Sequence, residues 1–130
     1  MTQEDKELLL RDLCARLPYG LWIDDGYALA IHIDYSDVHF ENYFNGILNG
    51  DVKPYLRSMS SMTEEEKKEL FCLADELRNS FFKAKTSEER LKASSKHHHD
   101  CCQLYYSHHL DCGGLIEKGL ALEAPEEMYK

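Results

Sequence analysis

The stretch TEEEKKELFCLADELRNSFFKAKTSEERLKASSKHHHDCCQLYYSHHLDCGG, residues 63–114, predicts two consecutive α-helices that pack as an antiparallel pair. Thr63 with Glu66 is a capping box, in which each side chain accepts a hydrogen bond from the other residue's backbone N–H. Thr86 with Glu89 repeats this pattern and begins the next helix. Five apolar residues at helical spacing predict the packing face of the first helix: Leu70, Leu73, Ala74, Leu77 and Phe81.

The second of these helices is expected to run to about Leu110, because Gly113-Gly114 supplies the glycine that commonly follows a helix. Lys83 and Lys85 give the first helix a basic end, which suits the negative pole of the helix dipole. Two short apolar runs, residues 115–116 and 120–122, are expected to fold back onto the helices.

A further helix is expected at the N-terminus, over about residues 3–16. Thr2 is a suitable N-cap, and Asp5 places an acid in the first turn. Pro18 disfavours helical conformation at the residue before it, so the helix should end near Arg16. An apolar stripe predicts the face that packs on the rest of the chain: Leu9, Leu10, Leu13, Cys14 and Leu17.

Between these helices the apolar period changes to two, which is typical of β-strands. Residues 21–23 and the alternating residues 27–33 flank a turn at Asp24-Asp25-Gly26, and together they predict a β-hairpin. Trp22 falls on the opposite face of this hairpin from its two apolar neighbours. If no helix covers that face, it offers an apolar surface for a partner, made of Trp22, Ala28 and Ala30.

Residues 35–50 fit either a short helix or a strand, and residues 52–56 are a candidate third strand. Pro54 cannot donate a ladder hydrogen bond, so this strand is expected at an edge of the sheet. The elements together predict an α+β fold in one globular domain, residues 1–130. It consists of an N-terminal helix, a small antiparallel β-sheet made of the hairpin and the edge strand, and two longer packed α-helices.

The composition is that of an acidic globular protein. A formal net charge of −9 repels nucleic acid and anionic lipid, so neither is expected as a partner. The N-terminal residues MTQEDKELLL are acidic where a signal peptide would be basic, and no apolar stretch approaches the ~18 residues that span a bilayer. We therefore expect no membrane partner, a cytoplasmic location, and five cysteines that are free thiols.

Side chains that bind metal ions concentrate in one segment, HHHDCCQLYYSHHLDC, residues 97–112. It holds five of the seven histidines and three of the five cysteines. On a helix, residues four apart lie on one face, separated by about 6 Å along the axis. Three such pairs are two-ligand sets for a zinc-like ion: His97/Cys101, His98/Cys102 and His108/Cys112.

A structural zinc site needs four ligands, so the metal hypothesis places Zn²⁺ on His98, Cys102, His108 and Cys112. These residues spread along the predicted helix, and the site therefore requires a break in the helix or ligands from elsewhere in the chain. The alternative is purely structural, with histidines at the surface and small side chains buried. Its buried stripe is Leu91, Cys101, Leu104, Tyr105 and His108.

Catalytic interpretations rest on fewer residues. Cys101-Cys102 would be a redox pair if a thiolate pKa were lowered. His32 and His39 with Asp34 and Asp37 define a polar patch on which a hydrolase could be built. The chain has no GxSxG elbow, phosphate-binding glycine loop or dinucleotide fingerprint, so no catalytic or cofactor-binding residue is assigned.

Three long stretches carry a resemblance: LCARLPYG (13–20), KPYLRSMSSMTEEEKKEL (53–70) and HHLDCGGLIEKGLALEAPEEMY (108–129). They resemble a group of short uncharacterised proteins encoded by phages and integrated mobile elements of gut anaerobic bacteria. The resemblance implies a bacterial cytoplasmic setting and an accessory role in a mobile element. It transfers no functional residue to this chain.

The leading hypothesis is therefore a small cytoplasmic accessory protein of a phage or mobile element that binds another protein and is not an enzyme. The first alternative is a zinc-binding module that uses residues 97–112. The second alternative is a hydrolase.

Overall fold

The structure, a computed structural model, describes residues 1–24, 30–34, 36–37 and 39–129. Within these residues the fold is α+β, with four α-helices and a four-stranded mixed sheet. The elements in chain order are α1 (Gln3–Arg16), η1 (Leu17–Tyr19), β1 (Leu21–Asp24), β2 (Ala30–Ile33), α2 (Phe40–Asn49), β3 (Lys53–Leu56), η2 (Met59–Ser61), α3 (Glu64–Lys83), α4 (Ser87–Ser107) and β4 (Leu122–Glu123).

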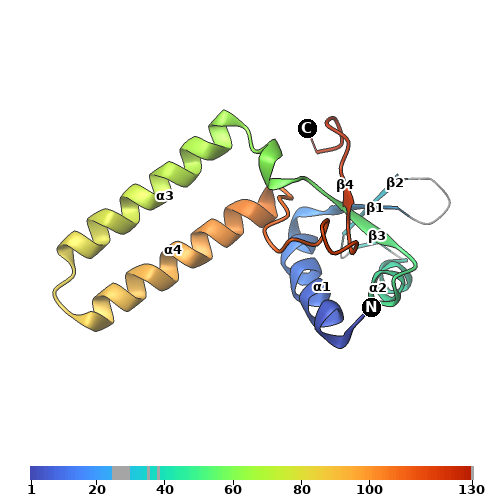
Figure 1. Cartoon of the computed structure of the whole chain (residues 1–130), viewed down its shortest axis with the longest axis horizontal. Coiled ribbons are helices and arrows are strands. Elements are labelled where there is room, and N and C mark those ends of the chain that lie inside the picture. The colour runs from blue at the N-terminus through green and yellow to red at the C-terminus, as the bar shows by residue number, and fades with distance from the viewer. Residues whose placement is uncertain (25–29, 35, 38, 130) are drawn as a thin grey trace.

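The two longest helices, α3 and α4, run side by side away from the rest of the molecule (Figure 1). We call residues 64–107 the arm, and we call the sheet with α1, α2 and the C-terminal segment the body. The predicted N-terminal helix and the predicted antiparallel pair are both confirmed. In the part of the chain that the structure describes, no helix is both long and apolar enough to cross a membrane.

Both arm helices begin at the predicted caps. The Thr63 hydroxyl accepts from the Glu66 N–H at 3.2 Å, and the Glu66 carboxylate accepts from the Thr63 N–H at 2.8 Å. The Thr86 hydroxyl accepts from the Glu89 N–H at 3.1 Å, whereas the Glu89 carboxylate accepts from the Lys85 N–H at 2.7 Å. The first capping box is therefore complete, and the second uses the neighbouring backbone donor.

The end of α4 differs from the prediction. The helix stops at Ser107, and His109 adopts a left-handed φ of 59°. The backbone then pairs with the residue after β3, because the Arg57 N–H donates to the His109 carbonyl and the Asp111 N–H donates to the Arg57 carbonyl, both at 2.8 Å. This pairing takes the chain out of the helix before Gly113-Gly114, so the prediction that these glycines end it is wrong.

The N-terminal helix has the predicted bounds and the predicted capping residue, Thr2. Leu10 and Cys14 belonged to the predicted apolar stripe, but both are exposed. Asp12 and Arg16 are buried on this helix in their place. They are four residues apart, so they form an internal ion pair that allows their burial. Three leucines of the predicted stripe are buried as expected: Leu9, Leu13 and Leu17.

The β-hairpin is confirmed, and its register pairs Leu21 with Ile33 and Trp22 with His32. Leu21 and Ile23 are fully buried while Trp22 is half-buried, which is the alternation that the period of two predicts. The turn at residues 25–29, including Ala28 of the candidate apolar surface, lies outside the described residues.

The strand that contains Pro54 is not at an edge of the sheet. The strand order is β2-β1-β3-β4, so β3 lies between β1 and β4, and the prediction of an edge strand is wrong. The β4 strand pairs in parallel with β3, which makes the sheet mixed rather than antiparallel. Proline is accommodated because β4 begins to pair at Tyr55, one residue beyond Pro54.

A tyrosine from the C-terminal segment completes this sheet. The Tyr129 hydroxyl accepts from the Trp22 N–H at 3.0 Å and donates to the Tyr55 carbonyl at 2.6 Å. The antiparallel pairing of β1 with β3 covers Asp24 and Ile23 and stops before Trp22. The hydroxyl therefore bridges the two backbone groups at the end of this ladder, which would otherwise lack partners.

The hydrophobic core lies in the body, and within the described residues none of it comes from the arm. Residues 35–50, for which helix and strand were both open, contribute α2 and its buried Ile47. The apolar runs near the C-terminus pack into this core. Its buried residues are Leu9, Leu13, Leu17, Leu21, Ile23, Ile33, Ile47, Leu56, Leu115, Leu120 and Ala121.

Candidate functional site

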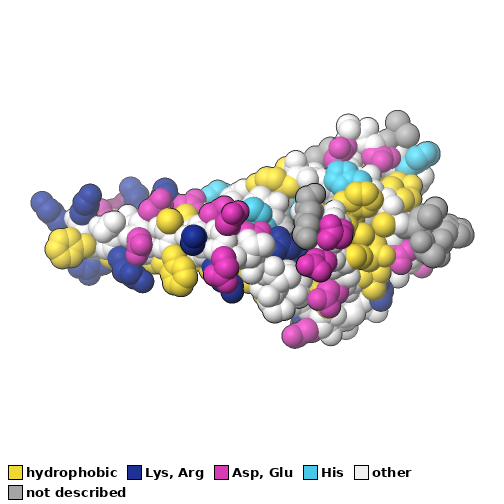
Figure 2. All heavy atoms as spheres, turned by 90° about the horizontal axis from the view of Figure 1, so that it is seen from above, with side chains coloured by type: hydrophobic (Ala, Val, Ile, Leu, Met, Phe, Trp, Pro, Cys, Tyr) yellow, Lys and Arg dark blue, Asp and Glu magenta, His cyan; other side chains and the backbone are white. Residues whose placement is uncertain are grey.

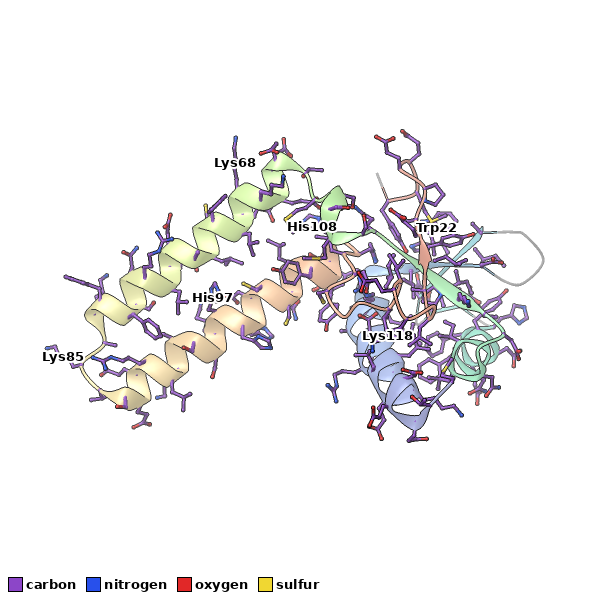
Figure 3. All side chains as sticks on the ribbon, viewed as in Figure 1. Trp22, Lys68, Lys85, His97, His108 and Lys118 are labelled. Atoms are coloured by element: carbon purple, nitrogen blue, oxygen red, sulfur yellow. The ribbon has the colours of Figure 1, made fainter. Side chains whose placement is uncertain are left out.

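The arm joins the body through a polar network centred on Glu66, in the first turn of α3. Its carboxylate accepts from both terminal nitrogens of Arg57, each at 2.8 Å, and lies 3.0 Å from His108 Nδ1. Glu69 lies 3.5 Å from the other ring nitrogen of His108. Arg57 follows β3 and His108 caps α4 (Figure 3), so the network connects both arm helices to the sheet.

The charges of this junction stabilise one another. Hydrogen bonds from Arg57 lower the pKa of Glu66 to about 2, and the same bonds raise the pKa of Arg57. Arg57 also donates to the Ser61 and His108 carbonyls, at 2.9 and 3.2 Å. These donors and acceptors are used within the chain, which is the arrangement of a structural joint rather than of a catalytic centre.

A second polar group is buried where α1 meets the segment after α4. The Arg16 guanidinium is fully buried and donates to the Asp12 carboxylate at 2.7 and 3.0 Å. It also donates to the Leu110 carbonyl at 2.6 Å and lies over the Tyr106 ring, 5.1 Å from its centroid. These contacts hold the end of α4 against the body.

His109 is a buried histidine beside this group. Its ring stacks on that of Tyr129, with centroids 4.1 Å apart. Burial, with a smaller contribution from the positive charge of Arg16, lowers the pKa of His109 to about 4. The imidazole is therefore neutral at pH 7 and contributes packing rather than charge.

A cleft of about 300 Å³ opens at the junction of the arm and the C-terminal segment. Its charged walls include the Arg57–Glu66 ion pair and the His108 ring already described. Because the guanidinium is engaged by Glu66, the cleft does not present it to an anionic ligand. The lining residues are Arg57, Ser58, Ser61, Thr63, Glu66, His108, Glu123, Ala124, Pro125, Glu126 and Tyr129.

The structure does not bring the four predicted zinc ligands together. His98 Nε2 lies 3.7 Å from Cys102 Sγ, so these two side chains meet. The chain does leave the helix before His108, which was one of the two conditions for the predicted site, but the His108 ring contacts Glu66 instead of a second ligand pair. Across the described residues, no group of three or more His, Cys, Asp or Glu side chains could hold a metal ion.

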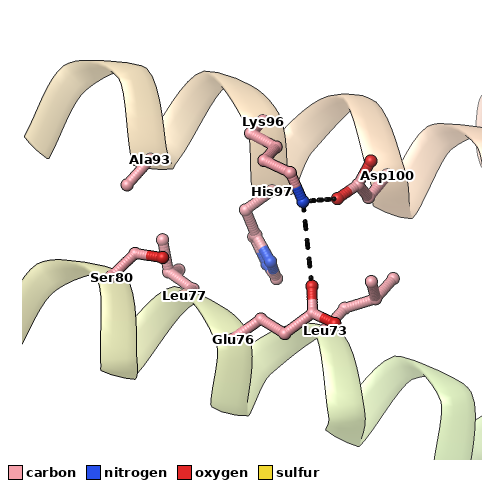
Figure 4. Close-up of a pocket in the computed structure, with 8 residues that line it drawn as sticks. All are labelled: Leu73, Glu76, Leu77, Ser80, Ala93, Lys96, His97 and Asp100. Carbon is pink, nitrogen blue, oxygen red and sulfur yellow. Dashed lines mark hydrogen bonds and ion pairs between the residues drawn. The ribbon is translucent and has the colours of Figure 1, made fainter. Parts of the chain in front are cut away.

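The neighbouring His–Cys pair of α4, His97 and Cys101, points in another direction. His97 Nε2 lies 3.5 Å from Cys101 Sγ, and His97 points from α4 toward α3 (Figure 4). Lys96 lies beside it and contacts Asp100 at 2.9 Å and Glu76 at 3.8 Å. Burial raises the pKa of the Cys101 thiol, which is opposite to the shift that a reactive thiolate needs.

The polar patch proposed for a hydrolase is explained by turn geometry. Asp34 Oδ1 accepts from the Ser36 N–H at 2.8 Å and from its hydroxyl at 2.5 Å. Asp37 Oδ1 accepts from the His39 N–H at 2.8 Å. Both carboxylates therefore bind the backbone two residues later, which is the local contact by which Asp stabilises turns. His32 packs its ring against Trp22, with centroids 5.3 Å apart.

The most unusual surface of the chain is the arm, which exposes large apolar side chains. Phe71 is 68% exposed, Phe82 is 92% exposed and Leu91 is 67% exposed. Leu91 belonged to the predicted buried stripe of α4, of which Leu104 is buried. Phe81, at 40% exposure, belonged to the predicted packing face of α3. Among the helices that the structure describes, α4 alone packs extensively on α3, so this face is half-covered rather than buried.

Charge is distributed unevenly along the arm. Figure 2 shows Lys and Arg side chains gathered toward its free end. Residues 78–92, which we call the tip, contain five basic and two acidic residues. Residues 64–76, which we call the base, contain six acidic and two basic residues. The arm therefore has a positive tip and a negative base.

No sequence pattern indicated that Arg57, Glu66 and His108 are partners. Glu66 was recognised as a helix cap, but its ion pair joins the first turn of α3 to Arg57, nine residues earlier, across the connector that contains η2. Comparison with known proteins adds no assignment: no family model, no curated protein and no solved structure matches the chain.

Proposed function

We propose that this chain is a small cytoplasmic accessory protein of a phage or mobile element that acts by binding another protein, and that the arm is the binding element. The observation that carries the proposal is the exposure of Phe71 and Phe82 on α3, at 68% and 92%. Removing a phenylalanine side chain from water contributes about 1.5–3 kcal/mol, so a partner that covered both would gain substantially.

The two phenylalanines are suited to one binding surface. They are eleven residues apart, which is about three helical turns, so they lie on the same face of α3 about 16 Å apart. A partner with an apolar groove along this face would bind the helix in the way that amphipathic helices are commonly bound. An acidic rim on the partner would complement the basic tip of the arm.

The proposal is tested by placing a photo-crosslinking amino acid at Phe82 and, in a separate chain, at the exposed residue Leu10 of the body. We expect the Phe82 chain to cross-link to a protein in its native host cell and the Leu10 chain not to do so. The double variant Phe71→Ser/Phe82→Ser should lose the cross-link when the photo-reactive group is moved to the neighbouring residue Asn79, while its circular dichroism is unchanged.

Two results would contradict the proposal. Cross-links that form only from the body would exclude the arm as the binding element. Turnover of any substrate in a broad panel, abolished by one point substitution, would show that the chain is an enzyme instead.

A further inference from the structure

Two side chains near the middle of α4 have the geometry of half a zinc site. His98 Nε2 and Cys102 Sγ are 3.7 Å apart and form a weak hydrogen bond. In a tetrahedral zinc site, bonds of about 2.3 Å to sulfur and 2.0–2.1 Å to nitrogen separate those two atoms by about 3.6 Å. The two ligands are therefore already spaced to bind one ion, and the site lacks two further ligands.

The other His–Cys pair of α4 is less accessible. His97 points toward α3 (Figure 4) and lies in the hollow between the two helices, together with Leu73 and Leu77. That hollow has little free space, about 20 Å³. His98, by contrast, is exposed and Cys102 is half-buried. Ligands from another molecule can therefore approach the His98–Cys102 pair more freely than the His97 ring.

The direction of His98 follows from helix geometry. Each residue turns about 100° around a helix, so Lys96 and His98 lie on opposite sides of the line along which His97 points. Lys96 contacts Glu76 of α3 at 3.8 Å, and these two residues mark the first flank of the arm. His98 and Cys102 therefore belong to the second flank.

The second flank is also apolar on α3. Leu73 lines the hollow between the helices, and Glu76 lies on the first flank, so Leu70 and Ala74 turn toward the second. They were predicted to be packed, but both are only half-buried because α4 covers one side of this face. We define the second flank by the residues that share it: Leu70, Ala74, Phe81, Leu91, His98 and Cys102.

The charges and dimensions of the arm fit a second copy laid against this flank in the opposite direction. Summed over all its faces, the arm is basic at the tip and acidic at the base, so an antiparallel arrangement brings opposite net charges near one another at both ends. The symmetry axis of two fully overlapping arms passes near their midpoints. Ala74 and His98 lie next to the midpoints of α3 (Glu64–Lys83) and α4 (Ser87–Ser107), so the axis brings both His98–Cys102 pairs together.

We propose that two copies of this chain pair antiparallel through the second flank, and that His98 and Cys102 of each copy hold one shared Zn²⁺ on the symmetry axis. The site has two imidazole nitrogens and two thiolates, a common ligand set of structural zinc. Each thiol releases its proton when the metal binds. The pairing also covers Leu70, Ala74 and Leu91, which the single chain leaves partly exposed.

This inference goes beyond the proposed function. Phe71 and Phe82 lie on the face of α3 that points away from α4, so they remain available in the paired molecule. Either proposal can therefore fail alone. A cross-link from Phe82 to a foreign protein in a chain that stays monomeric supports the first and overturns the second.

The test begins with a tag-free chain, reduced, freed of metal with a chelator and then titrated with Zn²⁺ alone. Mass from sedimentation and bound metal from mass spectrometry after desalting are the two measurements. We expect a dimer with one zinc per two chains. Its dissociation constant in Zn²⁺ should be at least tenfold lower than the value measured in the presence of the chelator. One zinc per monomer, or a mass that zinc leaves unchanged, would overturn the proposal.

A matched pair of variants identifies the ligands. His98→Ala/Cys102→Ala should lose both the bound zinc and the zinc-dependent dimer, with unchanged helical content by circular dichroism. His99→Ala/Cys72→Ala removes the same two residue types from exposed positions of the arm and should retain both. Equal loss in the two variants, or no loss in the first, would exclude this ligand set.

Charge reversal tests the orientation of the two arms. Lys83→Glu/Lys85→Glu makes the tip acidic, and Glu64→Lys/Glu65→Lys/Asp75→Lys makes the base basic. Each variant alone should dimerise at least tenfold more weakly in the presence of zinc, because tip and base then carry charges of the same sign. An equimolar mixture should recover the dimer as a heterodimer. A mixture that stays monomeric would exclude the antiparallel arrangement.

Discussion

Glu66 has two structural roles, as a helix cap and as a partner in an ion pair, and only the first was predicted from the sequence. The residue pattern identifies it as the partner of Thr63 in a capping box, and the structure confirms that contact. The same carboxylate also binds Arg57 and His108, which connects the helix end to the sheet. Because one side chain closes both the cap and the joint, its loss should affect the attachment of the whole arm.

We expect Glu66→Gln to lower the free energy of unfolding by about 2–3 kcal/mol at pH 7. The Glu66 pKa is about 2 in the folded chain against an ordinary value of 4.5, so its ionised form stabilises the fold above pH 4.5. That contribution is lost as the pH falls from 4.5 toward 2. Urea unfolding across this range should show the wild type and the variant converging in acid.

The control for this variant is Glu64→Gln, two residues earlier on the exposed side of the same helix. Its carboxylate is 84% exposed and pairs with Lys67 at 3.3 Å. An exposed pair of this kind contributes less than about 0.5 kcal/mol. If both variants lose the same amount of stability, the junction is not the cause.

His109 should make the protein sensitive to mild acid. Its pKa is lowered from 6.5 to about 4 by burial, so the neutral ring stabilises the fold above pH 6.5. This contribution is lost as the pH falls from 6.5 toward 4. The variant His109→Asn is chosen because asparagine tolerates the left-handed φ of 59°. Between pH 6.5 and pH 4 we expect its free energy of unfolding to fall by about 3 kcal/mol less than that of the wild type.

The measurement is the free energy of unfolding at pH 7, 6, 5 and 4, with His99→Asn as the control. His99 is exposed on α4, so its variant should keep the pH dependence of the wild type. A wild-type slope in His109→Asn would contradict the role assigned to this ring.

At the scale of elements, the sheet depends on a side chain from the end of the chain. Tyr129 bridges the Trp22 N–H of β1 and the Tyr55 carbonyl of β3. No signal near β1 or β3 predicts this contact, because Tyr129 is 107 residues from Trp22. The position of β3 has a similar cause: Pro54 indicated an edge strand, but β4 arrives from the C-terminal segment and covers that edge.

We expect Tyr129→Phe to lower the free energy of unfolding by about 1–3 kcal/mol, because it leaves a backbone donor and a backbone acceptor without a partner. Hydrogen exchange at the Trp22 amide should accelerate by at least tenfold. Tyr19→Phe is the control, since the Tyr19 hydroxyl bonds to Gln103 at the surface. Unchanged exchange at Trp22 would show that the bridge does not stabilise the ladder.

The elements that the sequence predicts best are those with local signals. The α1 and α3 helices begin at their capping residues because an N-cap and its partner lie three residues apart and form contacts without the rest of the chain. The hairpin follows from alternation within one short segment. The end of α4 was not predicted because it depends on Arg57, about fifty residues away.

At the scale of the whole molecule, the hydrophobic core cluster of the described residues lies in the body and has no member from the arm. Shortening the arm should therefore leave the body folded. Replacing residues 77–95 with a short loop that joins Glu76 to Lys96 keeps the Glu66 junction, and the two residues face each other across the arm, with Lys96 Nζ 3.8 Å from Glu76 Oε2. We expect cooperative thermal unfolding with Tm within about 5 °C of the wild type.

The matched control replaces α2, residues 40–49, with a loop, which removes the buried Ile47 from the core. This shorter deletion should abolish cooperative unfolding, as followed by Trp22 fluorescence. If shortening the arm also abolishes cooperative unfolding, the body does not fold independently of the arm, and the separation of core and arm described above is wrong.

The candidate binding surface was only partly accessible from the sequence. The cluster at residues 97–112 was identified from its composition, and the i,i+4 spacing of His98 and Cys102 was sufficient to predict that they meet. Their separation from His108 and Cys112 was expected for a continuous helix. It could not be predicted that the break after Ser107 leaves them apart, because the turn there directs His108 to Glu66. The exposure of Phe81 and Leu91 also depends on how many helices pack there, which no local pattern specifies.

Local sequence was thus enough for the α+β class, the helix starts and the hairpin, because each follows from contacts within a few residues. The tertiary structure decided the central position of β3, the end of α4 and the projection of the arm from the body. These features arise where segments far apart in the chain compete for the same backbone groups and the same apolar surface. The outcome of that competition is a property of the folded molecule and is not encoded in any one segment.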